Sequence, residues 1–95
     1  MEYLQTLGFT QDQINRILNI NHEIVVDQIT KKPRLVKNNL IFLKDLGVTN
    51  YKEIFVEYAE VFLQDTSVFK EIFLMYDRED LIEKLKRNMS IIVRL

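Results

Sequence analysis

Two eight-residue segments of this 95-residue chain carry the same pattern, thirty-nine positions apart. Residues 3–10 read YLQTLGFT and residues 42–49 read FLKDLGVT, so an aromatic residue, two leucines, a glycine, an apolar residue and a threonine match in order. Leucines followed by glycine are typical of a helix end, because glycine readily takes the left-handed conformation there. Self-similarity at a period of about 20 to 50 residues indicates stacked supersecondary units. We therefore expect a chain of near-repeated units.

A second internal match supports this interpretation. INRILNINHEIVV at residues 14–26 resembles LIEKLKRNMSIIV at residues 81–93, with Asn21 aligned to Asn88, and YAEVFL at residues 58–63 takes the corresponding middle place. Each unit then contains a helix end, a Leu-Gly turn, a capped helix, a short apolar piece and another helix, and such units bury their faces by stacking. The predicted domain is a single one over residues 1–95, with units at about 1–33, 34–66 and 67–95.

Helix signals fill most of the chain. Thr10 and Gln13 have the spacing of a capping box, so we expect a helix over residues 11–19. A second helix over residues 33–46 begins with proline, which the first turn tolerates, and ends at Gly47. Strand alternation is absent over any useful length, and the fold class is therefore all-α. Three further helices are predicted to start at caps on Asn50, on Thr66 or Ser67, and on Asp77.

Seven aromatic residues follow one another at helical spacing in the second half of the chain. Such a stripe could stack on nucleic-acid bases, but helical spacing places most of these side chains along buried stripes in the core. They are Tyr51, Phe55, Tyr58, Phe62, Phe69, Phe73 and Tyr76.

Composition excludes most catalytic and metal chemistry. The chain has no cysteine and one histidine, His22, so we expect neither a thiolate site nor a zinc site, and no catalytic residue or cofactor. In the repeat alignment His22 suits a turn-packing or exposed role. Asp77, Glu79 and Asp80 lack the glycine and distal glutamate of a calcium loop and suit a helix start instead. The chain lacks a signal-peptide pattern and any apolar run of about 20 residues, so we expect a cytoplasmic protein without a membrane span.

Charge is banded along the sequence although the net charge is −1. Residues 31–49 hold five basic side chains against one acidic, and residues 81–95 hold four against one, whereas residues 50–80 hold three against eight. A local basic field, not the net charge, decides where an anionic partner docks. The candidate nucleic-acid-binding residues are Lys31, Lys32, Arg34, Lys37, Lys84, Lys86 and Arg87.

The stretch PRLVKNNLIFLKDLGVT at residues 33–49, together with LGFT at residues 7–10, resembles repeats of the mitochondrial transcription termination factor (mTERF) family, as in a short bacterial-type member. The resemblance implies a short, curved, left-handed stack of three-helix repeats, a small solenoid without an active site, and a nucleic-acid-binding or transcription-related role. The chain departs from the family pattern in its third unit, which reads MYDRED in place of the Leu-Gly turn. The family's usual proline is replaced by His22, Ala59 and Met89.

Two functions remain open. The first is a non-enzymatic module that binds DNA or RNA through the basic residues above, with little sequence preference. The alternative is a protein-protein interaction adaptor or small regulatory protein that docks on another protein, or on itself, through its helical faces and its apolar C-terminal end SIIVRL. Whether the two basic segments share one face decides between these hypotheses.

Overall fold

The chain is helical from end to end, as the all-α prediction requires. The computed structural model describes all 95 residues and contains no strand. No helix is both long and apolar enough to cross a membrane. The elements are α1 (Glu2–Thr6), α2 (Gln11–Ile20), α3 (Glu23–Lys31), α4 (Pro33–Leu46), α5 (Tyr51–Glu57), η1 (Ala59–Leu63), α6 (Thr66–Leu74), α7 (Arg78–Arg87) and η2 (Met89–Arg94), where η marks a 3-10 helix.

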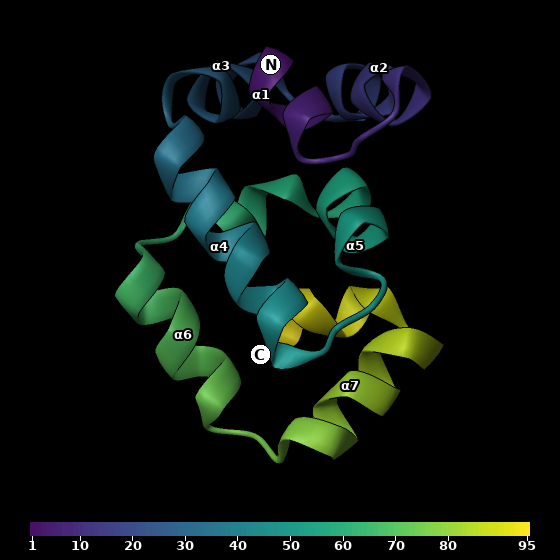
Figure 1. Cartoon of the computed structure of the whole chain (residues 1–95), viewed down its shortest axis with the longest axis vertical. Coiled ribbons are helices and arrows are strands. Elements are labelled where there is room, and N and C mark those ends of the chain that lie inside the picture. The colour runs from purple at the N-terminus through teal and green to yellow at the C-terminus, as the bar shows by residue number, and fades with distance from the viewer.

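The longest helix, α4, crosses the middle of the molecule (Figure 1). In this view α1, α2 and α3 lie across the top, α6 lies at the left and α7 at the lower right. The order of two α-helices followed by a 3-10 helix occurs from α4 to η1 and again from α6 to η2. The molecule measures 33 × 25 × 23 Å along its principal axes. The curved left-handed stack of three-helix repeats stays a prediction.

Both Leu-Gly turns end a helix in the way that the sequence predicted. Gly8 and Gly47 have φ angles of +96° and +108°, in the left-handed region that side chains rarely adopt. In each turn the amide after the glycine donates a hydrogen bond to a carbonyl five residues earlier, which is the Schellman arrangement. Phe9 donates to Leu4 at 3.0 Å and Val48 to Leu43 at 3.1 Å, and all four side chains are buried.

Alanine at Gly47 is expected to lower the free energy of unfolding by more than alanine at Gly8 does. The left-handed conformation costs a side chain about 1–2 kcal/mol at either position. At Gly47 a Cβ atom would also lie 3.1 Å from Ile82 Cδ1 and 3.2 Å from Arg78 Nη2, and Arg78 is held by a 2.6 Å hydrogen bond to the Leu46 carbonyl. At Gly8 the neighbour is Lys52 Nζ, the far end of a flexible side chain that donates a long, 3.4 Å hydrogen bond to the Gly8 carbonyl and can move aside.

Urea unfolding of both variants measures the two costs. We expect losses of about 1–2 kcal/mol for Gly8→Ala and about 2–3 kcal/mol for Gly47→Ala. A Gly47→Ala protein as stable as the wild type would show that the turn relaxes without strain.

The segment after residue 22 was predicted as a short apolar piece, and that prediction is wrong. Residues Glu23–Lys31 form the regular helix α3, which His22 starts, because its Nδ1 accepts a 3.1 Å hydrogen bond from the Ile24 amide. The far end of α3 is fixed by Ile29, whose side chain is fully buried and whose carbonyl accepts a 2.7 Å hydrogen bond from the Tyr3 hydroxyl. Burial raises the pKa of Tyr3 to about 12. His22 is exposed, in agreement with one of the two roles expected from the sequence, but its capping of α3 was not predicted.

Two predicted helix caps also differ from those in the structure. Asn50 precedes α5 but makes no capping bond; its Nδ2 donates instead to the Leu85 carbonyl at 3.2 Å. Asp65, not Thr66 or Ser67, caps α6 by accepting a hydrogen bond from the Ser67 amide at 3.0 Å. The Thr10 capping box and the Asp77 cap are confirmed.

The core includes a row of aromatic rings from three neighbouring elements. Phe62 of η1 lies 5.1 Å from Phe55 of α5 and 5.4 Å from Phe69 of α6, measured between ring centroids, and Phe69 lies 4.7 Å from Phe73. These four rings are buried, as predicted. Tyr51 and Tyr58 are only partly buried and Tyr76 is exposed, so most but not all of the seven aromatic side chains lie in or against the core.

The apolar C-terminal segment folds back on the protein. In η2, Ile92 is buried, and Ile91 and Leu95 pack partly buried against the core. Only Val93 of the apolar residues in this segment is largely exposed, at 58%.

Candidate binding surfaces

The structure separates the seven predicted basic residues into two groups. Lys31, Lys32, Arg34 and Lys37 lie at the junction of α3 and α4, and Lys84, Lys86 and Arg87 lie on α7. In Figure 1 the α3–α4 junction is at the upper left, whereas the C-terminal end of α7 is at the lower right. The two groups therefore do not form one continuous patch.

The α7 group is largely paired with carboxylates of its own helix. Lys84 lies 2.9 Å from Asp80, and Arg87 lies 3.1 Å from Glu83, both one helical turn apart. Such exposed pairs contribute little stability, but they lower the local positive field. Lys86 is the one member of this group without an ion pair.

In the group at the α3–α4 junction, most of the basic side chains have no ion-pair partner. Lys31 pairs with Asp27 at 3.0 Å, but Lys32, Arg34 and Lys37 have no ion-pair partner. Lys44, from the same basic segment, is also exposed and unpaired. We call the four unpaired residues Lys32, Arg34, Lys37 and Lys44 the α4 basic face.

Helix geometry puts the three members that belong to α4 on one side of the helix, and Lys32 precedes its first residue. At about 3.6 residues per turn, Arg34, Lys37 and Lys44 fall close together around the helix axis. The opposite side of the helix is buried and contains Val36, Asn39, Leu40 and Leu43. Lys44 was left out of the predicted site, although its spacing of seven residues from Lys37 was the signal that it shares the face.

One further exposed cation lies beside α4, on the flank of the helix that carries Phe42. Lys70 of α6 holds its Nζ 5.8 Å from the ring centre of Phe42 on α4. The sequence did not indicate it, because the contact joins two helices. Asp45 is the single acidic residue on α4, so the surface stays positive overall.

At the start of α4 the surface is hollowed, with a volume of about 410 Å³. No side chain caps the first turn of α4. Asp65 brings one carboxylate into the hollow, and the hydrogen bonds that it accepts from Ser67 lower its pKa. The polar lining consists of Lys31, Lys32, Arg34, Asn38, Asp65 and Thr66.

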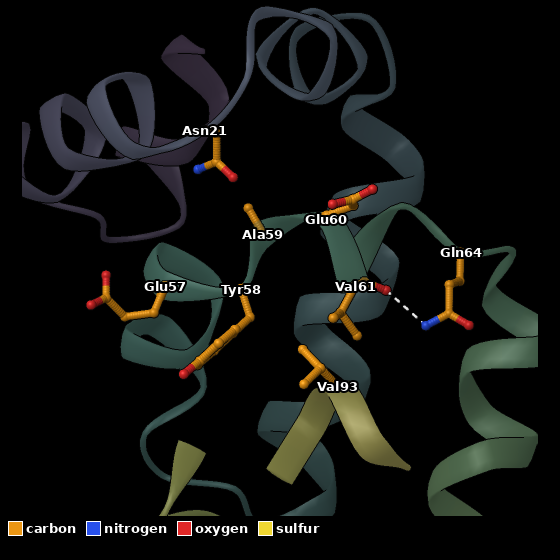
Figure 2. Close-up of a pocket in the computed structure, with 8 residues that line it drawn as sticks. All are labelled: Asn21, Glu57, Tyr58, Ala59, Glu60, Val61, Gln64 and Val93. Carbon is orange, nitrogen blue, oxygen red and sulfur yellow. Dashed lines mark hydrogen bonds between the residues drawn. The ribbon is translucent and has the colours of Figure 1, made fainter. Parts of the chain in front are cut away.

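A second concave surface runs along the two 3-10 helices. It consists of two adjoining hollows of about 430 and 220 Å³ that share Val61, Gln64 and Val93. We call it the η1–η2 groove. Figure 2 shows Val93 of η2 pointing toward Val61 of η1, with Tyr58 and Glu57 on one side of them and Gln64 on the other. The larger hollow is also lined by Asn21, Glu57, Tyr58, Ala59 and Glu60, and the smaller one by Ile72, Phe73, Ile92 and Leu95.

The polar end of the η1–η2 groove is acidic. Both carboxylate oxygens of Glu57 accept hydrogen bonds from the Arg16 guanidinium at 2.7 Å, which lowers the pKa of Glu57 and raises that of Arg16. Glu60 has no ion-pair partner. Neither hollow is lined by a lysine or an arginine.

No group of three or more histidine, cysteine, aspartate or glutamate side chains is placed to hold a metal ion. Comparisons with known proteins found no match among family models, curated proteins or solved structures. The resemblance to termination-factor repeats and the cytoplasmic location therefore stay predictions.

Proposed function

We propose that this chain is a non-enzymatic helical-repeat module that binds the nucleic-acid backbone through the α4 basic face. The observation that carries the proposal is that Arg34, Lys37 and Lys44 lie exposed along α4, with Lys32 just before its first residue, and that none of the four has an ion-pair partner. Unpaired cations can neutralise phosphates and release their counterions. Cations already paired with carboxylates contribute less binding free energy, because they must first give up that partner.

The dimensions of α4 suit such a contact. From Arg34 to Lys44 the helix rises about 15 Å, because each residue adds about 1.5 Å. One strand of a duplex carries a phosphate every 3.4 Å or so along its axis, so the face covers about four phosphates. Contacts of this kind position a protein without reading bases, and we expect binding with little sequence preference.

Fluorescence anisotropy with single- and double-stranded DNA and RNA across a salt series tests this function. The variant Lys37→Gln/Lys44→Gln removes two unpaired charges from α4, and its matched control, Lys84→Gln/Lys86→Gln, removes two charges from α7. We expect the α4 variant to bind more weakly and to reduce the slope of log K against log salt by about 2, since each phosphate contact contributes about 1. The α7 variant is expected to keep the wild-type slope.

Two results would contradict the proposal. The first is no binding to any of the four nucleic acids at low salt. The second is an equal loss in both double variants, which would mean that net charge alone governs binding.

A second candidate is the protein-interaction adaptor, and one observation favours it. Three consecutive apolar residues at the turn between α6 and α7 are exposed: Leu74 by 66%, Met75 by 79% and Tyr76 by 43%. Clustered exposed apolar side chains are typical of a protein-binding surface. One form of this hypothesis is that the partner is a second copy of the chain. In that case sedimentation equilibrium is expected to give a mass that rises with protein concentration in the wild type but not in Leu74→Ser/Met75→Ser.

A further inference from the structure

The η1–η2 groove combines an apolar end with an acidic end. At the apolar end Phe73 and Ile92 are almost fully buried and form the walls, and Val93 lies at the mouth. Val93, Val61 and Gln64 line both hollows, so the two ends are continuous. A bound segment can therefore extend from the apolar end to the carboxylates at the other end.

Glu60 is the carboxylate of the groove that is free to bind a cation. Both carboxylate oxygens of Glu57 already accept hydrogen bonds from Arg16, whereas Glu60 is exposed and has no ion-pair partner. The partly buried Tyr58 has a hydroxyl without a hydrogen bond inside the protein, and no lysine or arginine lines the groove. The charge of this end therefore favours a cationic group and disfavours a phosphate.

We propose that the η1–η2 groove binds a short peptide segment of a partner protein in which an apolar side chain stands next to a lysine or arginine. The apolar side chain enters the hollow between Phe73, Ile92 and Val93. The neighbouring cation pairs with Glu60, and the Tyr58 hydroxyl is placed to meet peptide polar groups. Pockets of this kind take their affinity from the apolar part and their orientation from a few polar groups.

The groove and the α4 basic face point away from each other. Asn39, on the buried side of α4, donates hydrogen bonds to the carbonyls of Phe62 and Gln64 at the end of η1, both at 2.9 Å. The buried side of α4 thus faces η1, and the basic face lies on the other side of the helix. Figure 2 views the molecule from the side opposite to Figure 1, with α6 at the right and η1 in front of α4. Peptide and nucleic acid therefore do not compete for one surface.

Three acetylated four-residue peptide amides serve as probes: one alternating leucine and lysine, one alternating leucine and glutamate, and one alternating serine and lysine. Each is titrated into the full, ¹⁵N-labelled chain and followed by NMR. We expect the leucine–lysine peptide to shift the amide signals of Val61, Gln64 and Val93, and the other two peptides to leave them unchanged. Shifts confined to other residues, or equal shifts with the leucine–glutamate or serine–lysine peptide, would overturn the proposal.

Substitutions separate this inference from the proposed function. Glu60→Gln is expected to weaken the leucine–lysine peptide about twofold to fivefold, the range of an exposed ion pair, and to leave nucleic-acid binding no weaker. The matched control Glu71→Gln, on α6 outside the groove, is expected to leave peptide binding at the wild-type value, as is Lys37→Gln/Lys44→Gln. An equal loss in Glu60→Gln and Glu71→Gln would show attraction to net charge and would overturn the groove as the site.

Discussion

Phe62→Ala is expected to lower the free energy of unfolding by about 3–5 kcal/mol, the range for truncating a buried phenylalanine. The ring of Phe62 is fully buried and lies between those of Phe55 and Phe69, with centroid distances of 5.1 and 5.4 Å. Truncation removes both ring contacts and leaves a cavity between α5, η1 and α6. For domains whose total stability is about 5–15 kcal/mol, this loss is large.

Urea unfolding followed by circular dichroism measures the effect. Tyr76→Ala is the matched control, because Tyr76 is an aromatic residue exposed by 43%, and its truncation is expected to change stability by less than about 0.5 kcal/mol. If Phe62→Ala unfolds at the wild-type urea concentration, the aromatic row is not the centre of the core. Should the variant be unfolded at 25 °C, Phe62→Leu, which keeps most of the apolar volume, is expected to fold with a smaller loss.

Asn39→Leu is expected to have the second largest effect, a loss of about 2–3 kcal/mol. The Asn39 side chain is fully buried, and its Nδ2 supplies hydrogen bonds to the carbonyls of Phe62 and Gln64. Leucine fills a similar volume but leaves the buried Phe62 carbonyl and the partly buried Gln64 carbonyl without that donor, and a buried unsatisfied polar group costs about 1–3 kcal/mol. The loss therefore reports on the hydrogen bonds and not on a cavity.

The neighbouring Asn38 provides the control. Asn38 is exposed on the same helix and makes no hydrogen bond with its side chain, so Asn38→Leu is expected to leave stability within about 0.5 kcal/mol of the wild type. Oδ1 of Asn39 is itself buried without a partner. An Asn39→Leu protein more stable than the wild type would mean that relief of this unpaired oxygen outweighs the loss of the two donors.

Asn39 also connects the two proposed surfaces. Its hydrogen bonds hold the end of η1, which forms one wall of the groove, against the helix that carries the basic face. Loosening this contact is expected to disturb peptide binding in the groove more than nucleic-acid binding along α4, because the basic face depends on the helix alone.

Signals that act over a few residues were enough to predict several elements from the sequence. The α4 bounds, the Thr10 capping box, the Asp77 cap and both glycine turns agree with the prediction, because each depends on neighbours within one or two helical turns. The missed helix α3 had no recognised start signal. Histidine is not among the preferred capping residues, yet His22 caps α3.

The candidate surfaces were only partly predictable. The sequence identified Lys32, Arg34 and Lys37 as a basic segment, and helical spacing could have added Lys44. The ion pairs that occupy Lys84 and Arg87 follow from their spacing of four residues from acids, a pattern that was present but unused. The η1–η2 groove left no sequence signal, because its walls come from separate segments, at residues 21, 57–64, 72–73 and 92–95, that only the tertiary structure brings together.

By itself, the sequence determined that the chain is all-helical, where most of its α-helices begin to within a residue or two, and that its charge is banded. Helix propensity, caps and glycine turns are properties of short segments. Only the tertiary structure decided that the two basic segments lie apart, that Asn39 is buried beneath η1, and that Glu60 and Val93 line one groove. These features depend on how helices pack, and packing is set by the combined fit of residues distant in the chain, such as Phe55, Phe62 and Phe69, which no local pattern specifies.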